Sequence, residues 1–132
     1  MDAGERIVLP LLHSLGERRL DRVVVSHDDS DHAGGAAAIA RAHPEASLLT
    51  SMPLESAARF GFARVQTCVA GQRWTWDGVE FRIVGPLPDK PVHSDNAASC
   101  VLHVAARGAS VLLTGDIDAR QEQALHAAGN LP

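Results

Sequence analysis

The stretch VVVSHDDSDHAGG, residues 23–35, constrains the fold more than any other part of the chain. It opens with three β-branched residues, which favour a buried strand, and these run into two histidines and three aspartates. Two glycines and an alanine-rich run follow, and such a run favours a helix. The pattern therefore predicts a strand that breaks into a polar turn and then enters a helix.

This polar turn carries four candidate metal ligands: His27, Asp29, Asp31 and His32. On a regular strand the first three would share one face and His32 would point away, whereas on a helix His27 and Asp29 would diverge. All four converge only where a strand breaks into a turn and the chain then enters a helix. Glycines at the helix start allow the close backbone approach that this needs. Mixed imidazole and carboxylate ligands suit Zn, Mn or Fe, and the sequence does not choose among them.

Three other interpretations of this stretch are weaker. A solvated acidic turn does not explain why so many charged groups cluster behind an apolar strand. A calcium-binding loop starting at Asp29 would need acidic residues where Ala33 and Ala40 stand. A phosphohydrolase with His-Asp pairs on helices would be an all-helical domain, which the preceding strand contradicts.

A further acidic position follows another apolar strand, in VLLTGDID. Gly115 lets the backbone turn, so that the Asp116 carboxylate can face inward. An aspartate after a strand more often caps the next helix, but Asp118 is the better cap candidate here. The local sequence therefore leaves open whether Asp116 is a metal ligand.

The rest of the chain mixes helices, strands and hairpins. We expect helices at 5–15, 34–43 and 118–128, strands at 22–26, 46–50 and 65–69, and hairpins around Asp77-Gly78 and Arg107-Gly108. Pro10 predicts a late start or a kink in the first helix. Residues 53–61 are expected to be irregular or a short helix, and 85–98 a long loop. This order favours a mixed α/β layered fold over a doubly wound parallel sheet, and 132 residues suit one domain and no second.

Composition excludes several classes of protein. The chain has no run of about 18 apolar residues, which a membrane span needs. Its start, MDAGERIVLPLL, lacks the basic segment and cleavage site of a signal peptide. A net charge of -4 argues against strong overall attraction to nucleic acid, although bound metal ions would reverse the sign locally. The two cysteines, Cys68 and Cys100, are too far apart for a CxxC motif and too few for a disulfide scaffold.

An HxDxDH motif after a strand, with a TGD motif about 80 residues later, resembles the metallo-β-lactamase fold superfamily. Asp29 stands where the general HxHxDH pattern has its second histidine. The segments DAGERIVLPLL, SHDDSDHAGG, GQRWTWDGVEF, NAASCVLHV and LLTGDID together resemble the hydrolase-like domain of ComEC-type DNA-internalisation competence proteins. The resemblance covers essentially the whole chain, and it implies an αββα sandwich.

The resemblance also implies a site with two divalent metal ions, Zn or Mn. The implied ligands are His27, Asp29, Asp31, His32 and Asp116, with Asp116 bridging the two ions. Two such ions about 3.5–4 Å apart polarise phosphoryl oxygens and activate water for in-line attack, and Asp31 would also orient the attacking water. Asp2 would support the site without contacting an ion, and Asn96 lies near the position of a metal-binding histidine in other members. The remaining histidines are expected to be surface or structural residues: His13, His43, His93, His103 and His126.

In function, the resemblance implies a DNA phosphodiesterase or nuclease of a DNA-uptake system, at the extracytoplasmic face of the inner membrane. The implied partners are DNA and a transmembrane channel domain, without membrane contact by this segment. The family has an opening hairpin with a DVGQG-like motif and a later HHGS-like segment, and neither occurs in this sequence. We therefore expect a fragment truncated at both ends, marginally stable and essentially inactive alone.

Two questions stay open at the level of the sequence. The oxidising compartment of the family suggests a disulfide between Cys68 and Cys100, and two buried free cysteines are the alternative. The rival functions are hydrolysis of another ester, such as a thioester or lactone, and a non-catalytic metal-binding module that guides DNA.

Overall fold

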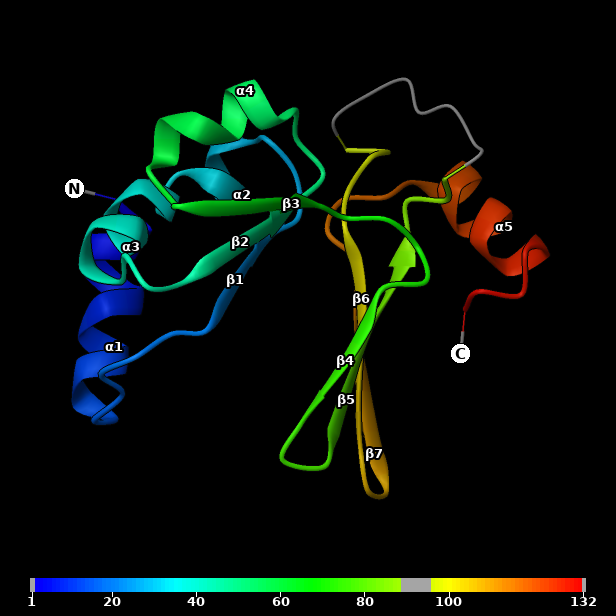
Figure 1. Ribbon diagram of the computed structural model, residues 1–132. Helices are drawn as coiled ribbons and strands as arrows, with labels where there is room; N and C mark the ends of the chain where they lie inside the picture. The colour runs from blue at the N-terminus through cyan, green and yellow to red at the C-terminus, as the bar shows by residue number, and fades with distance from the viewer. Residues whose placement is uncertain (1, 89–95, 132) are drawn as a thin grey trace. The chain divides into compact units, whose positions relative to one another are not determined.

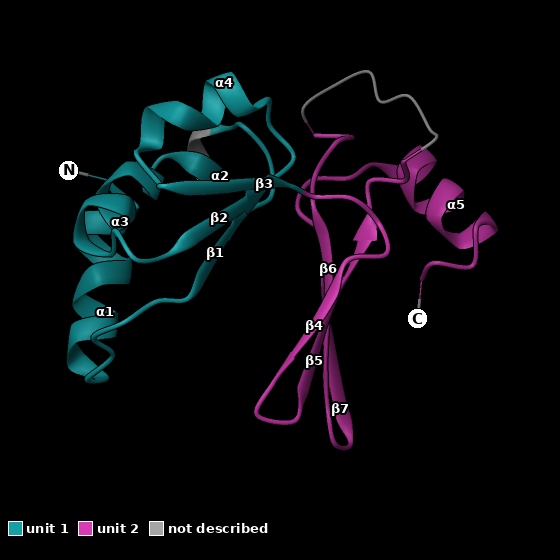
Figure 2. Ribbon diagram, in the orientation of Figure 1, with its two compact units in different colours: residues 1–67 teal, residues 68–132 magenta. Residues whose placement is uncertain are grey.

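The computed structural model describes residues 2–88 and 96–131, except for the side chains of Ser30 and Asp31. The chain divides into two compact units, residues 1–67 and 68–132 (Figure 2). Helices and strands are present in both units, so the mixed α/β class expected from the sequence is confirmed. The expectation of a single domain stays a prediction.

Unit 1 is built on a parallel sheet of three strands (Figure 1). The strands are β1 (Arg22–Val25), β2 (Ser47–Thr50) and β3 (Arg64–Thr67), in that order across the sheet. The helices are η1 (Gly4–Val8, a π-helix), α1 (Leu9–Ser14), α2 (Ser30–Ala33), α3 (Ala36–Ala42), α4 (Leu54–Ala57) and η2 (Ala58–Phe60, a 3-10 helix). Parallel strands need long crossovers, and α2 with α3 forms the crossover from β1 to β2.

Two helices of unit 1 differ from the sequence-based expectation. The first runs as a π-helix that continues directly into α1, so the helix neither starts late nor is regular, and Pro10 lies inside this continuous helical segment. The helix expected at 34–43 is preceded by the short α2, so that His32 already belongs to a helix rather than to the turn. The polar turn is therefore shorter than the sequence predicts.

A close backbone approach in unit 1 explains the glycines of the DAG and HAGG segments. A Cβ added to Gly35 would lie 2.5 Å from the Gly4 nitrogen, and a Cβ added to Gly4 would lie 2.4 Å from the Gly35 carbonyl oxygen. Real Cβ atoms do not come that close, so both positions need glycine. The start of η1 is thus packed against the start of α3, next to the polar turn.

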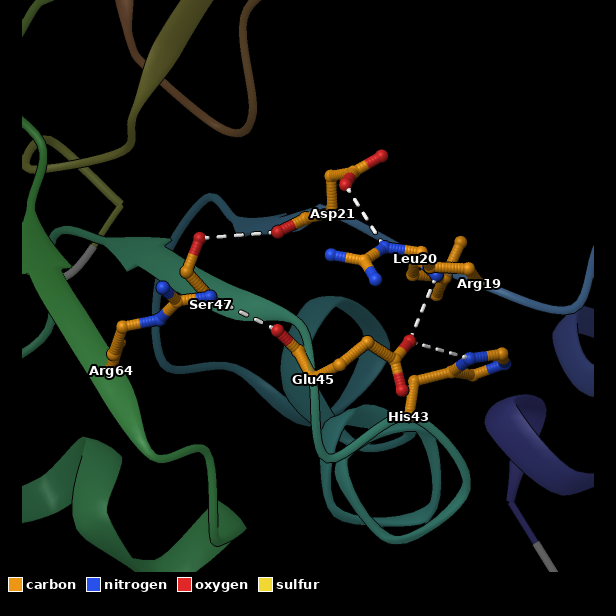
Figure 3. A network of polar contacts seen from close by, with 7 residues as sticks. All are labelled: Arg19, Leu20, Asp21, His43, Glu45, Ser47 and Arg64. Atoms are coloured by element: carbon orange, nitrogen blue, oxygen red, sulfur yellow. Dashed lines mark hydrogen bonds and ion pairs between the residues drawn. The ribbon is translucent and has the colours of Figure 1, made fainter.

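A polar network fixes the amino ends of the unit 1 strands (Figure 3). The Glu45 carboxylate accepts the backbone N–H of Leu20 at 2.9 Å and lies 3.2 Å from Nδ1 of the buried His43. The Arg64 guanidinium donates to the Glu45 carbonyl at 3.1 Å. The Leu20 hydrogen bond, and then that of Glu45's own N–H, holds the pKa of the Glu45 carboxyl below its usual range, and His43 adds to this. The network therefore ties the segments that precede β1, β2 and β3 together, at the end opposite the HDDSDH turn.

Unit 2 is an antiparallel sheet in which the strands follow chain order. They are β4 (Arg73–Trp76), β5 (Val79–Gly85), β6 (Val101–Ala106) and β7 (Ala109–Leu113), followed by helix α5 (Ala119–Ala127). Both predicted hairpins are confirmed. Asp77 and Gly78 have φ of 51° and 81°, as a two-residue hairpin turn requires. The Asp118 carboxylate accepts the Gln121 N–H at 3.0 Å, so Asp118 is the N-cap of α5, as expected.

The core of unit 2 lies between the sheet and α5. Val84, Val101 and Leu125 form its buried centre. A disulfide joins Cys68, before β4, to Cys100, before β6, with the two Cα atoms 5.8 Å apart. This is the pairing hypothesised from the sequence. Of the helices in the described residues, none has the length and apolar character that crossing a membrane would require.

Candidate metal centre

The polar turn of unit 1 begins at the carboxyl end of β1, and ligands of parallel α/β sheets bind at that edge. β1 ends at Val25, and Ser26 and His27 follow directly. The hydroxyl of Ser51, just after β2, donates to the Ser26 carbonyl at 2.8 Å. The neighbouring strand thus fixes the backbone from which the His27 side chain projects.

His27 and His32 lie against each other in unit 1. Their ring centroids are 4.2 Å apart, with the ring planes at 43°. His27 is only 1% exposed, whereas His32 is solvent-accessible. The Ser26 hydroxyl oxygen lies 2.9 Å from Nδ1 of His27 and 3.4 Å from Nδ1 of His32. A partner at one ring nitrogen orients the ring for ligation through the other, so Nε2 is the candidate ligand atom of both histidines.

Asp29 adds a carboxylate to the two imidazoles. Its Oδ2 lies 3.9 Å from Nε2 of His27, and its side chain is half exposed. Two ligand atoms on one ion, with bonds of about 2.0–2.2 Å, lie at most about 4.4 Å apart. The His27–Asp29 separation therefore fits a shared divalent ion, and the donor types suit Zn or Mn.

The backbone of Asp29 also places the second histidine. Its carbonyl oxygen accepts the N–H of His32 at 2.9 Å and that of Ala33 at 2.6 Å, which starts the short helix α2. This early helical turn brings the His32 ring back over His27. The structure therefore brings His27 close to both His32 and Asp29.

Asp28, which the sequence does not predict as a ligand, is engaged elsewhere. The Arg59 guanidinium donates to both of its carboxylate oxygens, at 2.5 Å and 3.3 Å. Such bidentate pairs are among the stronger hydrogen-bonded arrangements in proteins. The adjacent carboxylates of Asp28 and Asp29 thus have different environments, and only Asp29 contributes to the candidate centre.

Asp2 lies at the start of η1. Its Oδ1 accepts the N–H of Glu5 at 3.0 Å, as a helix N-cap does. Asp2 and His32 both line a cavity of about 430 Å³, whose apolar wall includes the three valines of β1. The described contacts give Asp2 a capping role, and its support of the metal centre stays a prediction.

The side chain of Asp31 lies outside the described residues, so its ligand and catalytic roles stay predictions.

Asp116 and Asn96 belong to unit 2. Gly115 has a φ of 57°, and the N–H of Asp116 donates to the hydroxyl of the fully buried Ser99 at 3.2 Å. Asp118 takes the capping role, and the ligand role of Asp116 stays a prediction. Asn96 lies in a turn, where its carbonyl accepts the Ser99 N–H at 3.1 Å.

Comparison with known proteins decides the family. Residues 2–131 match the family model described as the Metallo-beta-lactamase superfamily. The chain belongs to this superfamily. Members of the metallo-β-lactamase superfamily generally bind divalent metals, and His27, Asp29 and His32 supply the donor types for this.

The curated relatives of this superfamily member include much longer proteins. It is 40% identical to Competence protein ComA of Neisseria gonorrhoeae, over 93% of this chain and 16% of that protein. It is 40% identical to Recombination protein 2 of Haemophilus influenzae, over 91% of this chain and 14% of that protein. It is 29% identical to ComE operon protein 3 of Bacillus subtilis, over 91% of this chain and 16% of that protein. The chain thus spans about one sixth of the length of these relatives.

Solved structures support the fold alone. The Flv1 flavodiiron core of Synechocystis sp. PCC6803 matches with a TM-score of 0.58 and 17% identity, over 85% of this chain and 28% of that one. A possible metal-dependent hydrolase of Veillonella parvula matches with a TM-score of 0.53 and 18% identity, over 89% of this chain and 47% of that chain. Both matches support the mixed α/β fold of this chain.

Sequence reasoning missed Ser26. Its hydroxyl contacts Nδ1 of both histidines, so it orients two candidate ligands at once. The sequence signal for this role is a residue with a hydroxyl group between a strand and a histidine. That signal is weak, because serine is common wherever a strand ends in a turn.

Proposed function

We propose that this chain belongs to the metal-dependent hydrolase domain of a DNA-uptake protein and that this domain, within the longer protein, cleaves phosphodiester bonds of DNA. The observation that carries the proposal is the His27–His32 pair at the carboxyl end of β1, with the Asp29 carboxylate 3.9 Å from Nε2 of His27. The similarity to Competence protein ComA and Recombination protein 2 supports DNA as the substrate. Superfamily membership supports hydrolysis that depends on divalent metal ions.

The proposed ligands of two divalent ions, Zn or Mn, are His27, Asp29, Asp31, His32 and Asp116. When bound, the ions would polarise the phosphoryl oxygens and lower the pKa of water at the site. Without positive charge, the carboxylates of Asp29 and Asp31 would repel a phosphodiester, because like charges in a partly buried site are poorly screened. Binding of DNA at this site is therefore expected to require the metal-loaded protein.

The residues of unit 1 have distinct proposed tasks. Ser26 holds both imidazole rings through their Nδ1 atoms, which keeps Nε2 directed to the site. His27 is fully buried, so it forms the closed side of the site, and the half-exposed Asp29 lies on the side open to substrate. Asp31 would accept a hydrogen bond from the attacking water and so align it with the phosphorus atom.

We further propose an extracytoplasmic location at the inner membrane, with a transmembrane channel domain in the same protein. The disulfide between Cys68 and Cys100 supports this, because disulfides persist in oxidising compartments. The similarity to competence proteins supports the association with DNA uptake.

The test is a cleavage assay of the longer protein that contains this chain, on single-stranded and duplex DNA oligonucleotides with added Mn²⁺ or Zn²⁺. The 132-residue chain alone is expected to be essentially inactive. Cleavage should require the ion. The activity of the double variant His27→Ala/His32→Ala should fall by at least about 100-fold, because losing only the hydrogen-bond partners of metal ligands already costs about 10–100-fold. The control His126→Ala changes an exposed histidine in α5 and should cleave normally. Metal binding without any cleavage would instead favour a DNA-guiding module. Metal-dependent hydrolysis of thioesters or lactones alone would favour the other rival.

A further inference from the structure

Two arginines of unit 2 face each other across the β4–β5 hairpin. The strand register pairs Arg73 with Arg82, and it pairs Arg82 with His103 on the next strand, β6. Residues directly opposite each other in antiparallel strands share one face of the sheet, with Cβ atoms about 4.5–5.5 Å apart. Two guanidinium groups and an imidazole thus form one row across three neighbouring strands.

This row is not neutralised by the part of the chain that the structure describes. Neither Arg73 nor Arg82 forms an ion pair there, although other arginines of the chain do, such as Arg41 and Arg59. Nε2 of His103 is buried and has no hydrogen-bond partner among the described residues. Like charges directly opposite each other destabilise a sheet, so the row favours binding of an anion.

The arginines are accessible to such an anion, because both line one cavity of about 340 Å³. Leu87 and Pro88 contribute an apolar wall to this cavity. Asn130 also lines it and donates its side-chain amide to the Val84 carbonyl at 3.1 Å, which ties the segment after α5 to β5. The cavity is therefore lined by the sheet and by the segment after α5, and Arg73 and Arg82 both contribute to its lining.

We propose that this arginine cleft, formed by Arg73 and Arg82, binds phosphate groups of a nucleic-acid strand. A guanidinium group matches the geometry of phosphate oxygens and can donate two parallel hydrogen bonds to them. The chain has a net charge of -4, so its attraction to a polyanion is local, and a few arginines account for most of it. That the phosphates belong to DNA rests on the proposed function; the cleft itself needs no hydrolysis, since it lies within unit 2.

The test measures DNA binding in EDTA, where the proposed metal centre contributes neither binding nor cleavage. Fluorescence anisotropy of a labelled single-stranded oligonucleotide gives the affinity of the 132-residue chain. The double variant Arg73→Gln/Arg82→Gln should bind about tenfold or more weakly at low salt, because contacts of a few arginines with phosphates account for most of the affinity of an acidic chain for a polyanion. The slope of log affinity against log salt should fall in magnitude by about 1.4, which corresponds to two phosphate contacts on a single strand.

Three further variants distinguish the effect of the positive charge from the effects of misfolding and of the position of the arginines. Arg107→Gln/Arg120→Gln removes the same charge from exposed residues outside the cleft and should change the affinity by less than about twofold. Arg73→Lys/Arg82→Lys keeps both charges and should retain the salt slope. Glu80→Gln removes the acid on the same face, two residues from Arg82, and should tighten binding by about twofold.

Three results would overturn the proposal. One is equal DNA binding by the Arg73→Gln/Arg82→Gln variant and the Arg107→Gln/Arg120→Gln control. A second is an Arg73→Lys/Arg82→Lys variant that melts normally but has lost the salt slope. The third is displacement of the labelled strand by inorganic phosphate as readily as by unlabelled DNA of equal phosphate concentration, which would make the cleft a site for free phosphate. Loss of cleavage in the metal-loaded assay would leave all three readouts unchanged, so the two proposals fail separately.

Discussion

Units 1 and 2 differ in how their structure is encoded. In unit 2, the strands pair with their neighbours in the sequence, and short signals such as Asp77-Gly78 and the Asp118 cap fix the turns and the helix start. In unit 1, the strands are parallel, and contacts between distant segments fix them, such as Gly4 with Gly35 and Glu45 with Leu20. His27, with His32 and Asp29 beside it, lies in unit 1, the unit that depends on distant contacts.

This difference has a physical reason. A parallel sheet gathers the carboxyl ends of its strands at one edge, so turns at that edge bring polar side chains from separate positions together. Antiparallel hairpins place successive strand ends at alternating edges, and their registry follows from the turn itself. Neighbouring residues in the sequence therefore specify the strand pairing of unit 2. The predictions below test this contrast between the two units, in order of decreasing effect.

The largest effect on unit 2 should come from its disulfide. Replacing both Cys68 and Cys100 with alanine should lower the free energy of unfolding by about 3–4 kcal/mol, because the bond closes a loop of 32 residues. Both tryptophans, Trp74 and Trp76, lie in unit 2, so tryptophan fluorescence during urea unfolding reports on this unit. An unchanged urea midpoint, or two titratable thiols in the native unreduced protein, would contradict the prediction.

The largest effect on unit 1 should come from its glycine contact. Gly35→Ala would push a Cβ into backbone atoms of Gly4, and overpacking of this kind costs about 1–3 kcal/mol or more. Gly108→Ala in unit 2 is the comparison, because a Cβ there meets nothing within 4 Å and only the φ of 80° is strained, at about 1–2 kcal/mol. Thermal melts by circular dichroism should rank Gly35→Ala as the more destabilised. The reverse order would show that the contact between the two glycines matters little.

A smaller effect separates the two aspartates after β7. Asp118→Ala should cost about 1 kcal/mol, because it removes the N-cap hydrogen bond of α5. Asp116→Ala should weaken metal binding, whereas Asp118→Ala should leave metal binding unchanged. Calorimetric melting of both variants, with and without Mn²⁺, checks this. If Asp116→Ala leaves metal binding intact, its proposed ligand role is wrong.

The smallest effect is the pH dependence of the Glu45 network in unit 1. The pKa of Glu45 is lower in the folded chain than its ordinary value of 4.5, first because of the Leu20 hydrogen bond. The network's contribution to stability is therefore fully present above pH 4.5 and is lost as the pH falls through the lower folded pKa. Wild-type protein should lose stability across this acid range, and Glu45→Gln should lose less. Parallel stability curves for the two proteins below pH 4.5 would contradict this.

The sequence predicts some of these features better than others. The hairpin at Asp77-Gly78, the cap at Asp118 and the strand before His27 all follow from neighbouring residues, and the structure confirms them. The helix that begins at Ser30 did not follow, because it depends on the backbone hydrogen bonds to Asp29. The contact of Ser26 with two imidazoles did not follow, because it depends on where His27 and His32 meet in space. Residue spacing identified the ligand candidates, whereas backbone hydrogen bonds at Asp29 decided their arrangement.

The central claim is that the polar turn after β1 holds divalent metal ions. The direct test is the metal-to-protein ratio of purified protein after loading with Mn²⁺ or Zn²⁺ and dialysis, measured by mass spectrometry of the elements. We predict two ions per chain for the wild type and for His126→Ala, and none retained by His27→Ala/His32→Ala. A wild-type chain that retains no metal, or a double variant that retains as much as the wild type, would contradict the claim.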